Sequence, residues 1–380
     1  MAAIEMLARL KADTSGFTTA IKRAEDSLAQ FGNSAQSFGS TVSDKMSRAG
    51  SSLNSFGDSA AKTGAIASLS LTTPLMLAGG TALRTASDFE SSMSQVAQAV
   101  GLPASQVKDL SDLAIQMGAS TQFSANEAAQ AMVELAKGGF DPAAISGGAL
   151  NATMSLAAAG GLQLADAGTQ IVASMNSFGL SAGQSSQIAD ALAGAANASA
   201  ADVSDLGQAL TQAASQAAVS GQSLQGTTAA LAAMADMGIK GSDAGTSLKT
   251  MLTRLIPATD EAAGAMADYG LNFVNADGSM KSLTEVAGQL KSQLGGLGEA
   301  EKSKALETIF GTDAMRGAAA MMNVGAEGMA KYEAATSAAG NATGAAAARM
   351  GPTQKAMEEL SGAVETGWLK VSVTRFRAES

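Results

Sequence analysis

The stretch from Ser87 to Asp141 reads SDFESSMSQVAQAVGLPASQVKDLSDLAIQMGASTQFSANEAAQAMVELAKGGFD. Apolar residues recur in it at helical spacing, in three successive runs. The first run ends at Gly101-Leu102 and the third at Gly139-Phe140. Gly supplies the left-handed residue after a helix, and the apolar residue behind it folds back onto the last turn. The stretch therefore predicts three short amphipathic helices, the third of which can be capped by Ser124.

The same order of cap, amphipathic run, glycine and apolar residue recurs along the chain. The glycines predicted to end helices are Gly101, Gly139, Gly161, Gly179, Gly238, Gly270 and Gly311. Where such a glycine ends a helix we expect a positive φ. The stops are irregularly spaced, which argues against a solenoid of fixed period. The pattern predicts a mainly α fold, built as a succession of antiparallel helical hairpins.

Composition supports helices over sheets. Hydrophobic residues make up 46% of the chain but aromatic residues only 4%, with 42 glycines, so the core must consist of Ala, Leu, Met and Val. Strands, by contrast, are enriched in β-branched and aromatic residues. The formal net charge of -10 provides no generic attraction for nucleic acid.

The residues that most catalysis requires are missing. The 380 residues contain no His and no Cys, which removes the commonest general base, the commonest metal ligand and every thiolate. Phosphate-binding loops, nucleophile elbows and zinc-protease motifs are also absent from the sequence. We therefore predict no enzyme, and name no catalytic residue, no cofactor and no metal ligand.

The segment 1–60 carries a short alternating strand pattern and then a heptad pattern. We predict that this helical arm is coiled-coil-like and makes the protein an oligomer. The residues assigned to oligomerisation are Phe17, Ile21, Leu28, Phe31, Phe38 and Val42. The alternative is an amphipathic helix that packs on its own core.

Two further segments differ from the helical pattern. No charge occurs between Lys62 and Arg84, a length that could span a membrane. Pro74 and the Gly79-Gly80 pair favour a buried segment instead, although a membrane-active one remains open. Asp277-Gly278 stands between short apolar runs, which predicts a small β-ribbon over Leu271–Leu283.

Five motifs in order resemble the core region of phage tail tape measure proteins. They are SDFESSMSQVAQAVG, AMVELAKGGF, ASMNSFGLS, GTSLKTMLTRLIPAT and ALETIFGTDAMRGAAAMMNVG. The resemblance covers roughly Ala86 to Gly325, and the heptad arm is also similar. We accordingly divide the chain into 1–60 (strand and heptad arm), 61–86 (uncharged segment), 87–325 (tape measure core) and 326–380 (Ala/Gly-rich linker and helical tail).

The resemblance implies a structural protein of the virion tail, assembled in the host cytoplasm, that acts as ruler and scaffold for the tail tube. It implies tail-tube subunits, tail-tip proteins and tail assembly chaperones as partners, and release toward the host membrane when DNA enters the cell. Because such proteins continue into long helical sequence, we expect this chain to be truncated at its C-terminus. The alternative is a membrane-active or secreted helical protein that uses residues 64–83.

Overall fold

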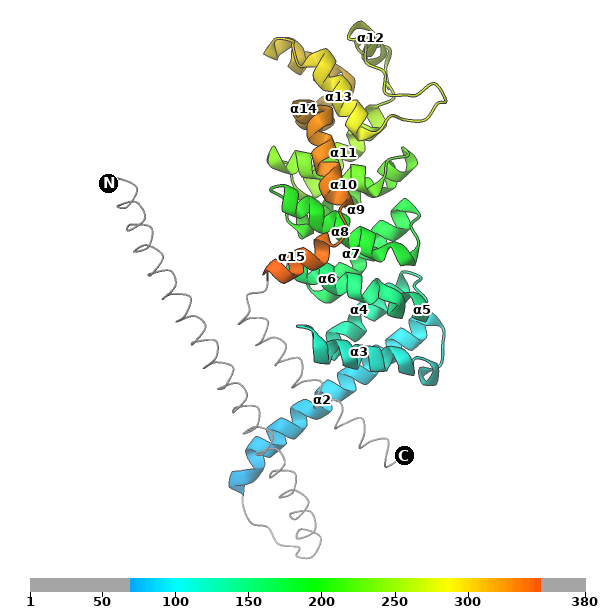
Figure 1. Cartoon of the computed structure of the whole chain (residues 1–380), viewed down its shortest axis with the longest axis vertical. Helices are drawn as coiled ribbons and strands as arrows, with labels where there is room; N and C mark the ends of the chain where they lie inside the picture. Colours follow the sequence, from blue (N-terminus) through cyan, green and yellow to red (C-terminus); the bar gives the residue numbers. More distant parts are fainter. Residues whose placement is uncertain (1–68, 350–380) are drawn as a thin grey trace, which may run out of the picture. The chain divides into compact units, whose positions relative to one another are not determined.

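The structure is a computed structural model that describes residues 69–349, of which residues 69–84 are described by their backbone alone. The chain divides into two compact units, Met1–Met76 and Leu77–Ser380. The described residues form helices joined by short connections, so the expectation of a mainly α protein is confirmed (Figure 1).

Apart from the longer segment 269–282 between α12 and α13, the helices follow one another with few residues between them. In chain order they are α2 (Leu69–Val100), η1 (Ala104–Gln106), α3 (Lys108–Ser120), α4 (Ala125–Lys137), α5 (Pro142–Ala144), η2 (Ile145–Ala149), α6 (Leu150–Gly160), α7 (Leu164–Phe178), η3 (Ala182–Gln184), α8 (Ser185–Ala198), α9 (Val203–Val219), α10 (Leu224–Asp236), α11 (Gly241–Arg254), α12 (Asp260–Asp268), α13 (Leu283–Leu294), α14 (Glu299–Ser337) and α15 (Asn341–Arg349).

The middle of the second unit consists of two rows of helices. Helices α4, α7, α9 and α11 form the first row, each packed against the next, and α6, α8 and α10 form the second (Figure 1). Helices α9 and α11 of the first row run parallel: Gly241 lies near Asp205, and one turn further along both helices Gly245 lies against Ala209. We call these two rows the helical stack.

The helical stack has a nearly constant period. The N-caps of the first-row helices are Ser124, Gln163, Asp202 and Lys240, so successive helices start at almost equal intervals along the sequence. The interval is roughly 40 residues, within the range of helical-repeat proteins, in which each repeat packs on its neighbours. We expected no fixed period because the glycines that end the helices are irregularly spaced. That expectation is wrong for the helical stack, where the helix starts, and not the helix ends, recur at nearly equal intervals.

The chain then returns along the second row. Helix α14 packs on α13, α11, α10 and α8, and α15 packs on α8 and α6 (Figure 1). We call α14 and α15 the return helices. They include residues 326–349, for which we expected an Ala/Gly-rich linker. The small side chains there allow close packing, and Met329, Ala342 and Ala346 are buried.

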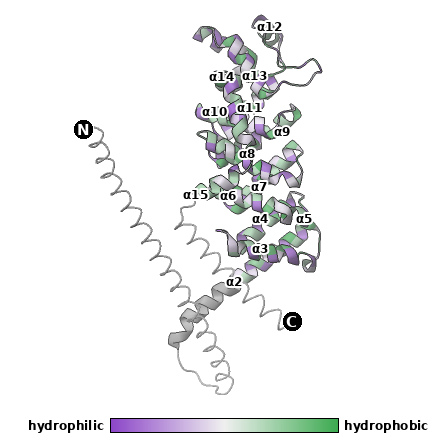
Figure 2. Cartoon of the chain, in the orientation of Figure 1, coloured by the Kyte–Doolittle hydropathy of each residue, from purple (hydrophilic) through white to green (hydrophobic). Residues whose placement is uncertain are grey.

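The core is made of small and flexible side chains. Hydrophobic and hydrophilic residues occur together on single helices, as amphipathic helices require (Figure 2). Helix α10 is the exception, since Ala229 through Met234 are all buried and the helix lies inside the stack. Gly245 lets α11 approach α9 closely, because a Cβ at this position would lie 2.8 Å from the Cα of Ala209.

The β-ribbon predicted for Leu271–Leu283 is not confirmed. The described residues contain one isolated antiparallel bridge there, between Val274 and Met280. Two backbone bonds flank this bridge, from Asn275 N–H to Ser279 O and from Lys281 N–H to Phe273 O. The ladder goes no further, since the Ser279 N–H donates to Asp277 Oδ1 at one end and the Leu283 N–H to Gln222 Oε1 at the other. The segment is instead held by Phe273, whose ring lies 6.2 Å from that of Phe310.

Candidate functional surfaces

The seven glycines predicted to end helices all have a positive φ, between 62° and 92°. Six of them are followed by an apolar residue whose N–H donates to a carbonyl five residues back, over 2.8–3.1 Å. The bonds Phe140 N–H to Leu135 O and Leu180 N–H to Met175 O are examples. Gly311 differs, because it lies within the range of α14.

Gly221 closes α9 in the same way but was not predicted from the sequence. Its φ is 70°, and the N–H of Gln222 donates to Ala217 O over 2.9 Å. The residue after the glycine is polar here, so the glycine-apolar pair is missing. The Gln222 side chain is nevertheless buried, because its amide bonds Lys281 O and the Leu283 N–H at the start of α13.

The residues assigned to oligomerisation, from Phe17 to Val42, lie outside the described residues. Residues 64–68 of the uncharged segment lie outside them as well. Within residues 69–349, no helix combines the length and the hydropathy needed to cross a bilayer. The same residues contain no group of three His, Cys, Asp or Glu side chains placed to hold a metal ion.

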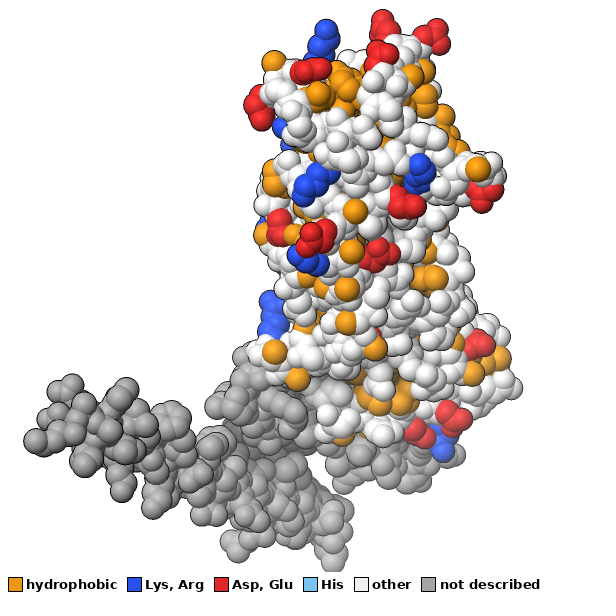
Figure 3. Space-filling view, turned by 45° about the horizontal axis from the view of Figure 1, so that its top comes forward, with side chains coloured by type: hydrophobic (Ala, Val, Ile, Leu, Met, Phe, Trp, Pro, Cys, Tyr) orange, Lys and Arg blue, Asp and Glu red, His pale blue; other side chains and the backbone are white. Residues whose placement is uncertain are grey.

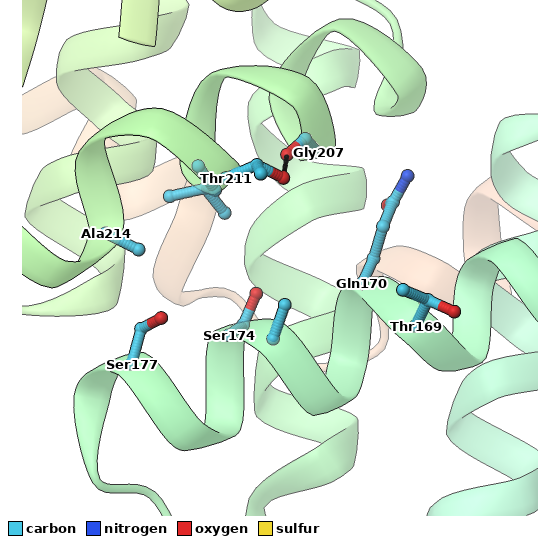
Figure 4. Close-up of a pocket in the computed structure, with 9 residues that line it drawn as sticks. Thr169, Gln170, Ser174, Ser177, Gly207, Thr211 and Ala214 are labelled. Carbon is cyan, nitrogen blue, oxygen red and sulfur yellow. Dashed lines mark hydrogen bonds between the residues drawn. The ribbon is translucent and has the colours of Figure 1, made fainter. Parts of the chain in front are cut away.

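A small cleft of about 140 Å³ lies between α7 and α9 (Figure 4). Thr169, Ser174 and Ser177 line it from α7, and Gly207 and Thr211 from α9. The hydroxyl of Thr211 donates to Gly207 O over 2.9 Å. None of the lining residues carries a charge, so the cleft offers hydroxyl groups and small apolar surface but no acid, base or charged ligand.

The wall of this cleft contains one unsatisfied polar atom. The Oε1 of Gln170 is buried and accepts no hydrogen bond. Gly207 makes room for this side chain, because a Cβ there would lie 2.9 Å from Gln170 Oε1 and nearer still to the rest of the amide. The close approach of α7 to α9 therefore depends on Gly207.

Asp190 of α8 fixes the start of α15. Its carboxylate accepts the backbone N–H groups of Gly340 and Ala342, each over 2.9 Å. Asn341 adds side-chain amide bonds to Asp190 O and Ala335 O. A carboxylate at a helix N-terminus satisfies free N–H groups and matches the helix dipole. Here the capping residue is 150 residues earlier in the chain.

Arg349 fixes the other end of α15. Its guanidinium donates to Ala159 O near the end of α6, over 2.7 Å, and lies against Gly161. A cation at a helix C-terminus is favourable for the same electrostatic reason. Both ends of α15 are thus held by charged side chains at the termini of helices.

A further set of hydrogen bonds joins α14 to Ala200, in the loop before α9, through Asp236 at the end of α10. Tyr332 donates its hydroxyl to Asp236, and the other oxygen of Asp236 accepts the Ala200 N–H over 2.7 Å. Lys240 donates to Ala200 O. Burial raises the pKa of Tyr332 to about 12, with further contributions from the hydrogen bond to Asp236 and from its charge.

Charged side chains on the surface stand singly or in small mixed groups, separated by uncharged surface, on the face that Figure 3 shows. The ion pair between Arg316 and Asp243 joins α14 to α11 over 2.7 Å, but both side chains are more than half exposed. Exposed pairs of this kind contribute about 0–1 kcal/mol. The arrangement suits a structural protein better than a steered binding site for a charged ligand.

Comparison with known proteins places the chain in a family. The family described as phage-related minor tail protein matches residues 111–311. The tape measure protein of Pneumococcus phage Dp-1 is 34% identical over 302 residues, which are 78% of this chain and 26% of that protein. The probable tape measure protein of Escherichia phage P2 is 28% identical over 272 residues, 70% of this chain and 33% of that protein.

No solved structure matches the chain. The chain spans between a quarter and a third of the length of the two tape measure proteins. The family match begins in α3 and ends inside α14, at Gly311, so it includes the whole helical stack.

Proposed function

Since the chain belongs to the phage-related minor tail protein family and is related to tape measure proteins, we propose that it is a structural protein of a phage tail that acts as ruler and scaffold in tail-tube assembly. The similarity over 78% of the chain to a tape measure protein is the observation that carries this proposal. The helical stack agrees with it, because a series of packed helices presents an extended surface for contacts with other tail components.

The partners in this proposal are tail-tube subunits, tail-tip proteins and tail assembly chaperones. The location is the virion tail, after assembly in the host cytoplasm. Release toward the host membrane when DNA enters is a further part of the proposal, supported by the lack of charge in residues 64–83. Homo-oligomerisation through the arm, from Phe17 to Val42, is supported by the heptad pattern.

The division into 1–60, 61–86, 87–325 and 326–380 also stays a proposal, as do the antiparallel hairpins and the coiled-coil character of the arm. The boundary between the two compact units, at Met76–Leu77, lies inside the uncharged segment and matches neither of its proposed limits. Because the helical stack has a regular repeat, the ruler function can be tested by deleting or duplicating one complete repeat.

The test removes residues 163–201, one complete repeat, from the gene of a phage that carries this chain. In a repeat array each unit packs on its neighbours, so an array can lose one and still fold. Because α8 also packs on α14 and α15, circular dichroism of the shortened chain must first show that it keeps its helical content. If the chain measures length as α-helix, the removed segment corresponds to about 58 Å of tail. Electron microscopy of the progeny should show tails shortened by about this amount, and lengthened equally when the repeat is duplicated.

The control replaces the same residues with an uncharged helical sequence of equal length. A ruler should then keep the parental tail length, even if fewer tails are made. Deletion and duplication that both leave the tail length unchanged would contradict the ruler function. Tails of random length would show that the region is needed for assembly without measuring it.

A further inference from the structure

Helix α14 contains two breaks, each formed by a single glycine. Gly311 has φ 74° and ψ 172°, and Gly325 has φ 67° and ψ -175°. These values lie in a backbone region that is essentially restricted to glycine. The breaks divide α14 into three helical segments, residues 299–310, 312–324 and 326–337. We call the two positions the helix joints.

Each helix joint replaces a loop between two helices with a single residue. Its positive φ is the value used just after a helix end, as at Gly161 and Gly179, and its extended ψ is the value of an N-cap, as at Ser124. One residue therefore ends one helix and begins the next. Connections between packed helices usually take two to eight residues. Rotation about the two backbone bonds of one glycine is enough to join two segments into a continuous helix.

Contacts from α13 hold the second helix joint. The ammonium of Lys291 donates to Asn323 O and Val324 O, the last carbonyls before Gly325, over 3.2 and 3.3 Å. These carbonyls would otherwise have no partner, because a helix leaves its last C=O groups free. The stem of Lys291 also lies against Gly325, where a Cβ would meet its Cδ.

Contacts from α11 and from the Phe273 segment hold the first helix joint. Phe310, immediately before Gly311, is buried against Phe273. After the joint, the hydroxyl of Ser247 donates to Asp313 O over 3.0 Å. Gly311 itself has no atom within 4 Å of a Cβ position, so no side chain packs on the joint itself.

We propose that α14 is a jointed helix that straightens at Gly311 and Gly325 into one helix, and thereby opens the return helices away from the helical stack. Segments as short as the three in α14 are marginal as isolated helices, because each must bear its own nucleation cost. A continuous helix of 39 residues, about 58 Å long, bears that cost once. Loss of the contacts with α11 and α13 therefore favours the straight form. Straightening uncovers the second row, α8 and α10, against which α14 packs. The inference does not depend on the proposed role in tail assembly.

The test measures a distance inside α14 of the full chain. The protein has no cysteine, so Ser303→Cys and Ala334→Cys, both at exposed positions, can carry spin labels without other changes. In a straight helix these positions lie about 46 Å apart. The bent form must give a shorter distance. Gly311→Ala combined with Gly325→Ala penalises the bent backbone and favours the helix, so the distance should lengthen to about 46 Å with helicity retained.

Lys291→Met provides a second variant that leaves both glycines in place. It removes the partners of Asn323 O and Val324 O, and we expect part of the population to show the long distance. Gly344→Ala in α15 is the matched control, because this glycine lies in a regular helix with open space around it, and the distance should stay short. If both test variants keep the short distance, or if the alanine variant loses its helical circular dichroism, the proposal is wrong.

Discussion

The helical stack and the return helices are held together in different ways. In the stack, helix ends are closed by bonds between near neighbours, such as Leu180 N–H to Met175 O. In the return helices, they are closed by partners far away in the chain, such as Asp190 at the start of α15 and Lys291 at the end of a segment of α14. The stack is therefore built from local signals, whereas the return helices depend on residues of other helices, α8 for α15 and α13 for α14.

The largest expected effect comes from breaking the stack itself, with Gly245→Val. The added side chain would meet backbone atoms of Ala209, which cannot move aside as a side chain can. Overpacking usually costs about 1–3 kcal/mol, and against backbone we expect the upper end of this range or more. Urea denaturation of this variant should be compared with Gly264→Val in α12, a helical glycine with open space around it. Equal stability of the two variants would contradict the close contact between α9 and α11.

A smaller effect is expected at one of the local closures, with Gly179→Val. In this variant a β-branched residue must adopt a φ of 62°, which should lower the free energy of unfolding by on the order of 1–3 kcal/mol. Gly179→Asn is the matched control, since Asn tolerates the left-handed region and should lose much less stability. Thermal unfolding distinguishes the two. If Asn and Val destabilise equally, the loss has another cause than backbone conformation.

Removing a long-range closure should have a local effect. In Asp190→Ala the N–H groups of Gly340 and Ala342 lose their acceptor, at a cost of about 1 kcal/mol as for other N-caps. Hydrogen exchange should accelerate over α15 while the amides of α9 and α11 keep their protection. Asp202→Ala at the start of α9 is the control for a local cap. Faster exchange throughout the stack in the Asp190 variant would show that the return helices are not a separate part.

The smallest effect concerns pH. The Tyr332 hydroxyl has a pKa raised to about 12 in the folded chain, above its ordinary value of 10.0, so the fold favours the protonated form. The stability contribution of this hydroxyl should therefore be constant below about pH 10 and fall as the pH rises toward 12, because the unfolded chain ionises first. Tyr332→Phe should remove this part of the pH dependence. A decline of the same slope in the variant would assign it to other groups.

Several features of the fold could be predicted from the sequence because they depend on neighbouring residues. The pair of a glycine and an apolar residue marks a helix end wherever the helix is, as at Gly139-Phe140. The capping of α4 by Ser124 follows equally from local sequence, and Glu127 completes a reciprocal capping box. The mainly helical character could be predicted on the same basis, and five short motifs were enough to indicate the relation to tape measure proteins.

Other features could not be predicted, because their cause is a distant residue. Gln163 and Lys240 start helices without a side-chain cap, so half of the starts that define the period have no sequence signal. The predicted β-ribbon is limited to one bridge, and the Leu283 N–H that would continue it donates to Gln222, 61 residues earlier. Residues 341–349 lie in the segment expected to be a linker but form α15, whose two termini are held by Asp190 and Arg349.

The sequence by itself thus determined where most helices end and that they bury small apolar faces, since both follow from backbone preferences and periodicity within a few residues. Only the tertiary structure decided that these helices stack with a nearly constant period and that the chain turns back along them. The physical reason is that Gly245 on Ala209, and Asp190 at the start of α15, acquire their roles only when distant helices meet.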